Sequence, residues 1–209
     1  MKVIFGTTNK RKIEDLQGII NELNLNIEVL GLSDIGWDRG ETEENGATVE
    51  ENSMMKARAI HEFCVEKKIP YPTIADDTGL FVDSLNGEPG IYTMRYADDE
   101  LAKDSTLPPY QCVIKLLRNL EGKPNRDATY KCCVTTILED GTSFQEIGTS
   151  KGYIKEGMPS EFKKPYHYCV FALKDSYKAF NELTKDELSD TFRYNALRKT
   201  LKRLKCHEE

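Results

Sequence analysis

Hydrophobic and polar positions change their period several times along this chain, and the changes predict alternating strands and helices. An apolar run over 2–6 precedes a polar turn and then Ile13, Leu16, Ile19, Ile20 and Leu23, which recur at helical spacing. Further strands are predicted near 27–30 and 69–75, and further helices near 48–66 and 109–120. A hairpin is predicted with strands over 129–136 and 143–147 and a turn at 139–141, and its second strand resumes near 152–154. The last predicted element is an amphipathic surface helix with Leu197, Leu201 and Leu204 on one face. This alternation indicates an α/β fold.

Two adjacent carboxylates, Asp76 and Asp77, follow the predicted strand over 69–75, and the segment Thr78-Gly79 comes directly after them. Ligands of α/β proteins bind where strands end, and neighbouring side chains of a strand point to opposite faces. One aspartate could therefore hold a metal ion while the other orients or deprotonates a water. The alternative interpretation is an ordinary surface turn, because Asp, Thr and Gly are common turn residues.

The turn Thr7-Thr8-Asn9-Lys10-Arg11-Lys12 opens the first predicted helix. Backbone N–H groups and the positive end of the helix dipole point to one place there, and Lys12 adds a charge suited to phosphate. Thr8 or Asn9 could equally be a simple N-cap, which is compatible with phosphate binding. The turn is not a Walker A loop, because the glycine spacing and the Lys-Ser/Thr ending are missing.

Two further segments bring charged side chains toward the predicted site. The acidic loop over 40–52 leads into a helix with Thr48 and Glu51 at capping-box spacing, and one of its acids could complete a magnesium site. The turn over 87–97 delivers Arg95 soon after the aspartates, and phosphate would be a natural partner for this arginine.

Composition narrows the class of protein. The chain has 209 residues, of which 39% are hydrophobic and 31% charged, enough for one substantial core. A net charge of −6 argues against a general nucleic-acid-binding surface, and no apolar run is long enough to span a membrane or to serve as a signal peptide, so the expected location is the cytoplasm. The six cysteines have no Cys-x-x-Cys spacing and are predicted to be reduced core residues, with Cys206 exposed.

Four motifs occur in an order that resembles the inosine triphosphate pyrophosphatase family, the house-cleaning purine nucleoside triphosphate pyrophosphatases. They are Thr7-Thr8-Asn9-Lys10-Arg11-Lys12, the run 43–52 with Lys56-Ala57-Arg58, the run 75–80, and Gly87-Glu88-Pro89-Gly90-Ile91-Tyr92 with Arg95-Tyr96-Ala97. The resemblance implies a single domain over 1–209, a mixed twisted sheet flanked by helices and elongated into two lobes around a central cleft. It also implies a homodimer.

The resemblance further implies hydrolysis of non-standard purine triphosphates (ITP, dITP and XTP) to a monophosphate and pyrophosphate, with Mg²⁺. Residues Thr7 to Lys12 then correspond to the triphosphate-binding turn, Lys56 to a buried catalytic lysine, and Asp77 to the general base. Glu44, Asp76 and Asp77 correspond to metal-binding acids, and Thr78 to a small residue near the substrate. A metal ion and lysines would neutralise the phosphate charge that a nucleophile has to approach.

The C-terminal half departs from the family where the purine base binds. The family's Phe-Gly-Tyr-Asp-Pro stretch is replaced by Phe162-Lys163-Lys164-Pro165-Tyr166-His167-Tyr168, and its Ser-His-Arg by Thr191-Phe192-Arg193. Arg193 is kept, while Tyr166, Tyr168 and Phe192 could stack on a base with little discrimination, or could be core residues. His167 is either a solvent-facing strand residue or a base contact.

Three alternatives therefore remain beside the favoured activity. The first is the same chemistry with a shifted or broadened nucleotide specificity. The second is a nucleotide-binding protein without turnover, which the presence of Glu44, Lys56 and Asp77 argues against. The third is an interaction module that uses the same fold. Only the generic surface charge of the chain supports it.

Overall fold

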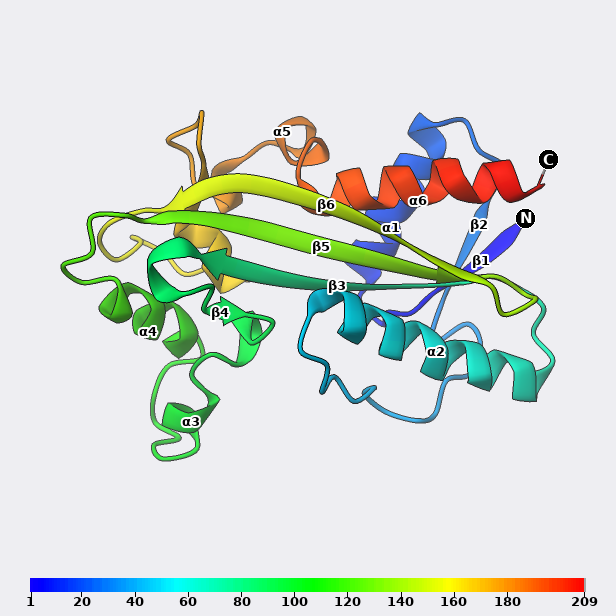
Figure 1. Cartoon of the computed structure of the whole chain (residues 1–209), viewed down its shortest axis with the longest axis horizontal. Helices are drawn as coiled ribbons and strands as arrows, with labels where there is room; N and C mark the ends of the chain where they lie inside the picture. Colours follow the sequence, from blue (N-terminus) through cyan, green and yellow to red (C-terminus); the bar gives the residue numbers. More distant parts are fainter. Residues whose placement is uncertain (209) are drawn as a thin grey trace. The chain divides into compact units, whose positions relative to one another are not determined.

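The computed structural model describes residues 1–208, and strands and helices alternate along the chain as predicted (Figure 1). The chain forms two compact units. Unit 1 comprises Met1–Thr78, Cys132–Gly148 and the C-terminal helix, and unit 2 comprises Gly79–Lys131 and Thr149–Thr191. A mixed sheet flanked by helices is therefore confirmed. The single domain over 1–209 and the central cleft stay predictions.

Unit 1 holds the predicted catalytic residues. Its elements are β1 (Lys2–Phe5), α1 (Lys10–Glu22), β2 (Glu28–Gly31), α2 (Val49–Lys67) and α6 (Phe192–Glu208), together with the parts of β3 (Thr73–Val82), β5 (Asp127–Ile137) and β6 (Ser143–Ile154) that fall in this unit. The strands follow the order β2-β1-β3-β5-β6, and β1 pairs in parallel with both β2 and β3.

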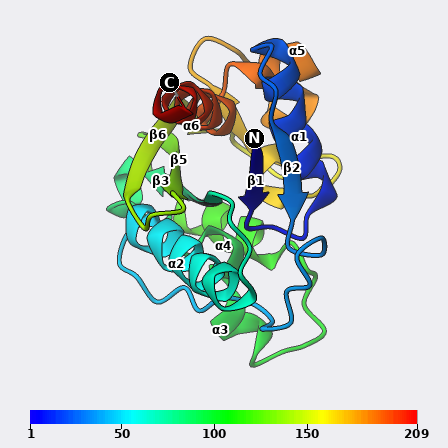
Figure 2. The same ribbon diagram turned by 90° about the vertical axis from the view of Figure 1, so that its right-hand side faces the viewer.

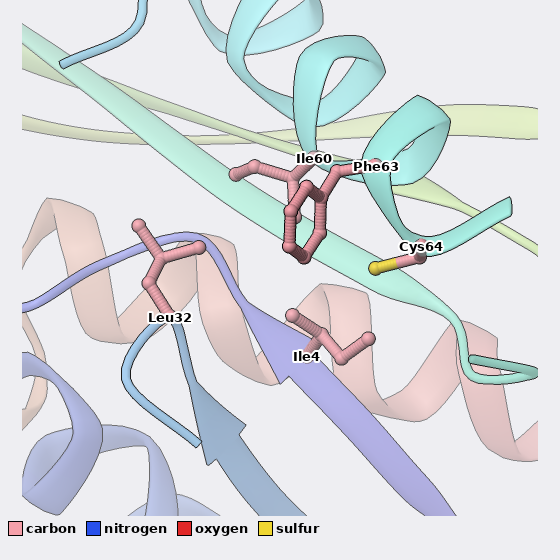
Figure 3. Packing of buried hydrophobic residues seen from close by; sticks show 5 residues of the cluster. All are labelled: Ile4, Leu32, Ile60, Phe63 and Cys64. Carbon is pink, nitrogen blue, oxygen red and sulfur yellow. The ribbon is translucent and has the colours of Figure 1, made fainter. Parts of the chain in front are cut away.

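The helices of unit 1 cover both faces of its strands. Figures 1 and 2 show α1 and α6 on one side and α2 on the other. On the α2 side, Ile4 of β1 packs with Leu32 and with the helix residues Ile60, Phe63 and Cys64 (Figure 3). All five side chains are less than a tenth exposed, and burying an aliphatic or aromatic side chain contributes about 1.5–3 kcal/mol. This core fixes α2 against β1.

Both long N-terminal helices start at residues that satisfy free backbone N–H groups. The Asn9 side chain accepts a hydrogen bond from the Arg11 N–H at 3.0 Å, and Thr48 Oγ1 accepts one from the Glu51 N–H at 3.1 Å. The predicted capping function of Asn9 and Thr48 is therefore confirmed. The last helix is amphipathic as predicted, since Phe192, Ala196, Leu197, Leu201 and Leu204 are buried whereas Lys199, Lys202 and Arg203 are exposed.

Two strand predictions were wrong. The strand expected to end at Ala75 continues through both aspartates to Val82, and β6 runs without the expected pause at 148–151. β3 can continue through the aspartates because cations from neighbouring helices balance their charge, as described below. In β6 the uninterrupted strand contains Gly148, which packs closely against α6: a Cβ at this position would lie 1.9 Å from the Phe192 carbonyl oxygen. A glycine in this strand therefore reflects packing and not a strand end.

Unit 2 contains shorter elements around an aromatic core. They are β4 (Pro89–Gly90), α3 (Asp98–Leu101), α4 (Gln111–Asn119), β7 (Phe171–Leu173), α5 (Lys185–Ser189) and the 3₁₀ helices η1 (Asp83–Leu85), η2 (Thr93–Arg95), η3 (Tyr166–Cys169) and η4 (Phe180–Glu182). Here β4 pairs with β3 and β7 pairs with β6, both antiparallel. The rings of Tyr130, Phe171 and Phe180 pack together, and Tyr168 packs against Tyr130 and Phe180. Tyr168 therefore packs against the aromatic core of unit 2 while it stays partly exposed.

The cysteine prediction is confirmed. All six cysteines are free, five of them are buried, and Cys206 is exposed. Burial raises the pKa of Cys132 to about 11 and that of Cys133 to about 12. Both thiols therefore stay protonated and unreactive near neutral pH. Among residues 1–208, no helix combines the length and the apolar character that crossing a membrane requires.

His167 lies in η3 with only 1% of its surface exposed, so the alternative of a solvent-facing strand residue was wrong. Its Nδ1 lies 4.0 Å from Cys112 Sγ, and burial lowers the pKa of His167 to about 4.

This burial predicts a loss of stability in acid. Between pH 6.5 and 4 His167 is protonated in the unfolded chain but neutral in the folded protein. The free energy of unfolding therefore falls as the pH decreases, and this group contributes up to about 3 kcal/mol to the fall. Urea unfolding of the wild type and of His167→Gln across this window measures the contribution. The wild-type curve should be steeper, and equal slopes would contradict the prediction.

Candidate active site

Asp76 and Asp77 lie side by side in β3, but their carboxylates contact different helices. They are only 3% and 8% exposed. Asp76 contacts Lys12 of α1 and Arg193 of α6, whereas Asp77 contacts Asn52 and Lys56 of α2. The alternation of a strand explains this division, and the surface-turn interpretation is wrong because both residues are buried strand positions. Two carboxylates with separate partners can carry out separate functions.

Asp76 is held by two cations. Lys12 Nζ lies 2.9 Å from its Oδ1 and 3.1 Å from its Oδ2, and Arg193 Nε lies 3.3 Å from Oδ2. Burial by itself would raise the pKa of Asp76, but the charges of Lys12 and Arg193 outweigh it and hold the pKa well below the ordinary value. Asp76 is therefore an anion that fixes two basic side chains in place.

At Asp77 the effects that raise the pKa outweigh those that lower it. Burial and the neighbouring charge of Glu44 raise its pKa above the ordinary value, against the lowering influence of Lys56. Lys56 Nζ lies 3.3 Å from Asp77 Oδ1 and 3.0 Å from Glu44 Oε1. Burial would lower the pKa of Lys56, but the surrounding carboxylates raise it, so this amine stays charged. A carboxylate with a raised pKa is well suited to accept a proton from water.

The predicted phosphate-binding turn lies at the start of α1. Thr7 is buried and its Oγ1 accepts a hydrogen bond from the Asn9 N–H at 3.1 Å. Thr8, Asn9, Lys10 and Arg11 are exposed around the first helical turn, while Lys12 reaches back to Asp76. A basic, exposed helix N-terminus is a favourable place for an anion.

The C-terminal candidates of unit 1 surround the same strand. The Arg193 guanidinium donates to Thr78 Oγ1 at 3.4 Å as well as contacting Asp76, so both predicted substrate residues lie at the site. Phe192 is only 1% exposed at the first position of α6. This burial favours the alternative that Phe192 is a core residue over its prediction as a stacking partner for a base.

The remaining two predicted site residues, Arg95 and Tyr166, belong to unit 2. Arg95 is exposed, with its guanidinium carbon 5.8 Å from the centre of the Tyr92 ring. Tyr166 is partly exposed and packs edge-on against Tyr110. Their functions in substrate binding stay predictions.

Sequence reasoning missed Asn52, which is fully buried and donates from Nδ2 to Asp77 Oδ2 at 3.3 Å. Its position four residues before Lys56 was the available signal, because residues four apart share one face of a helix. The pattern of the sequence did not show that this face points at Asp77.

The donor set around Asp77 fits a magnesium ion. Within residues 1–208, no three His, Cys, Asp or Glu side chains are grouped closely enough to hold a metal ion alone. Mg²⁺, however, uses one or two carboxylates together with waters and substrate phosphates. Glu44 and Asp77, which share Lys56, meet this requirement, whereas Asp76 is already held by Lys12 and Arg193. These contacts favour Glu44 and Asp77 over Asp76 as ligands.

A cavity of about 670 Å³ in unit 2 is separate from this chemistry. It is lined by residues of α4, the following loop and the segment 156–158, such as Leu117, Arg126 and Met158, and contains none of the predicted site residues. The carboxylate and lysine cluster of unit 1 is therefore the better candidate for an active site.

The site thus combines an α/β fold, a basic helix N-terminus, a partly buried lysine and two carboxylates whose pKa values are shifted in opposite directions. Residues 3–203 match the Ham1 family. A dITP/XTP pyrophosphatase of Flavobacterium johnsoniae is 38% identical over 156 residues, which cover 75% of this chain and 73% of that protein. One of Bacillus subtilis is 32% identical over 206 residues, which cover 98% of each.

Solved structures agree with this match. The Staphylococcus aureus Ham1 protein superposes with a TM-score of 0.80 and 28% identity over all of both chains. A nucleoside-triphosphatase, also titled dITP/XTP pyrophosphatase, of Mycobacterium abscessus superposes with a TM-score of 0.68 and 25% identity over 98% of both chains. The chain belongs to the Ham1 family.

Proposed function

We propose that this chain hydrolyses non-standard purine nucleoside triphosphates, ITP, dITP and XTP, to a monophosphate and pyrophosphate. The observation that carries the proposal is the environment of Asp77, a buried carboxylate with a raised pKa beside Lys56 and Glu44. Family membership and relatives named dITP/XTP pyrophosphatase support the same activity.

In the proposed reaction a water attacks the α-phosphorus and gives one proton to Asp77. The bond between the α-phosphorus and the bridging oxygen breaks, and that oxygen leaves with pyrophosphate. Lys56, held between Glu44 and Asp77, offsets the negative charge that accumulates near the attacked phosphorus. When bound by Glu44 and Asp77, Mg²⁺ would neutralise phosphate oxygens.

The start of α1 is the proposed binding place for the triphosphate chain. Exposed Thr8, Asn9, Lys10 and Arg11 offer N–H groups, polar side chains and positive charge. Lys12 is already held by Asp76, which orders the lysine before the substrate arrives. Preordering of this kind lowers the entropy cost of binding.

A shifted or broadened base specificity is the second candidate. It is favoured by the burial of Phe192 and by the contacts of Arg193 with Asp76 and Thr78, which leave Tyr166 and Tyr168 as the partly exposed aromatic residues among the predicted base contacts. Stacking on an aromatic ring discriminates poorly among bases.

The experiment that tests the proposal incubates the protein and Mg²⁺ with inosine, xanthosine, guanosine, adenosine and pyrimidine triphosphates, and measures pyrophosphate separately from orthophosphate. Pyrophosphate release that favours inosine and xanthosine substrates is the expected result. A preference for another nucleotide would support the second candidate. Tight nucleotide binding without pyrophosphate would instead identify a binding protein.

The homodimer and the cytoplasmic location rest on the family resemblance and on the sequence, and both stay predictions. Sedimentation of the purified protein would measure the first. A fluorescent fusion in the source cell would measure the second.

A further inference from the structure

Asn52 and Lys56 lie one helical turn apart on the same face of α2. Each contacts both Asp77 and the part of the acidic loop that precedes α2. Lys56 contacts Asp77 Oδ1 and the Glu44 carboxylate. Asn52 contacts Asp77 Oδ2 and the backbone N–H of Gly46. The two carboxylate oxygens of Asp77 are therefore held by different side chains of one rigid helix.

The contacts of Asn52 use both ends of its amide. Its Oδ1 accepts a hydrogen bond from the Gly46 N–H at 2.9 Å, and its Nδ2 donates to Asp77 Oδ2 at 3.3 Å. Because the residue is fully buried, each lost partner would leave a polar group unpaired. The amide thus joins the proposed base directly to the loop that carries Glu44.

The loop itself is shaped around this contact. A Cβ on Gly46 would lie 2.8 Å from Asn52 Oδ1 and 2.7 Å from the Glu51 Cβ, so only glycine allows this close approach. The Glu51 carboxylate accepts a further hydrogen bond from the Ala47 N–H at 2.6 Å. The first turn of α2 therefore holds the backbone just after Glu44 at two consecutive residues.

Resting on the proposed function, we infer that Asn52 is a positioning residue for this reaction. It fixes the rotation of the Asp77 carboxylate and the distance between Asp77 and Glu44. The free Asp77 Oδ2 lone pairs then face one direction, toward the water that is to be deprotonated. Groups that orient catalytic or metal-binding carboxylates commonly contribute about 10–100-fold in activity or metal affinity.

The test compares Asn52→Ala with Ser53→Ala. Ser53 is the matched control because it is also fully buried on α2 and its hydroxyl bonds the Ala75 carbonyl at 3.0 Å and Thr135 Oγ1 at 2.7 Å, away from the acidic loop. Both variants should lower the unfolding temperature. Only Asn52→Ala should lower kcat for inosine triphosphate, by about 10–100-fold, with KM changed less than about threefold.

A third variant separates the two contacts of the amide. Asn52→Asp keeps an acceptor for the Gly46 N–H but loses the donor to Asp77, so it should be as slow as Asn52→Ala. A kcat close to that of the wild type in Asn52→Asp, or equal kcat values in Asn52→Ala and Ser53→Ala, would overturn the inference.

A second readout does not depend on turnover. Mn²⁺ binding without nucleotide, followed by electron paramagnetic resonance, should weaken about tenfold in Asn52→Ala and stay unchanged in Ser53→Ala. If the wild type released no pyrophosphate, the proposed function would fail, while the Mn²⁺ result would still report on the positioning of Asp77 and Glu44. Equal Mn²⁺ affinity in both variants would contradict that positioning.

Discussion

Asp77→Asn is expected to remove most turnover, a loss of about 10²- to 10⁴-fold in kcat, while nucleotide binding stays close to that of the wild type. The amide keeps the size of the side chain and one oxygen that can accept a hydrogen bond from Lys56 or from Asn52, but it cannot accept a proton from water. Steady-state pyrophosphate release gives kcat, and calorimetric titration with nucleotide gives the affinity.

The same substitution should not lower stability. The raised pKa of Asp77 means that its charged form is less favourable in the folded protein than in the unfolded chain, so a neutral side chain removes a cost. We expect an unfolding temperature equal to or above that of the wild type. Gains in stability at the expense of activity are common where an active site holds unfavourable charges.

Asp76→Asn is the control for Asp77→Asn, because the two residues are adjacent and equally part of β3. Loss of the Asp76 charge should loosen Lys12 and Arg193 and therefore act mainly on KM and stability. A variant Asp77→Asn that keeps near-wild-type kcat, or an Asp76→Asn variant with the larger kcat loss, would show that the base is assigned to the wrong aspartate.

Lys56→Met is expected to lower kcat/KM by about 10²- to 10³-fold, as removal of a charged group near a reacting centre commonly does. Its side chain is 16% exposed and separates Glu44 from Asp77. Without it, two carboxylates face each other with no cation between them, which should reduce the free energy of unfolding by about 3 kcal/mol. Thermal unfolding with and without Mg²⁺ measures this cost.

Added Mg²⁺ should raise the unfolding temperature of Lys56→Met more than that of the wild type, because the cation replaces part of the missing charge. Lys178→Met supplies the comparison. Its ion pair with Glu187 is exposed on both sides and should contribute little. If Mg²⁺ raised the unfolding temperature of Lys56→Met no more than that of Lys178→Met, the acids beside Lys56 would not form the proposed metal site.

Local patterns predicted the frame of the site well, because their causes are local. The helix after Asn9 and the helix after Thr48 depend on capping groups and on apolar residues within a few positions, and both were predicted near their observed starts. The order of the four motifs likewise led to the Ham1 family from the sequence.

Errors arose where a distant segment changes the energy of a residue. A strand that passes through two aspartates is unfavourable in isolation, and it becomes possible when Lys12, Lys56 and Arg193 supply charge from three helices. His167 is polar by type, yet packing in unit 2 leaves it 1% exposed.

The sequence by itself determined the periodicity of the elements, the caps of the helices, the family and the identities of the chemical groups, since these follow from neighbouring residues and from motif order. Only the tertiary structure decided which partner each group has. Asp76 and Asp77 are the same residue type, one position apart, and their pKa values shift in opposite directions. At Asp76 the charges of Lys12 and Arg193 outweigh burial, whereas at Asp77 burial and the charge of Glu44 outweigh Lys56. Coulomb energies depend on distances in space, which the order of residues does not contain.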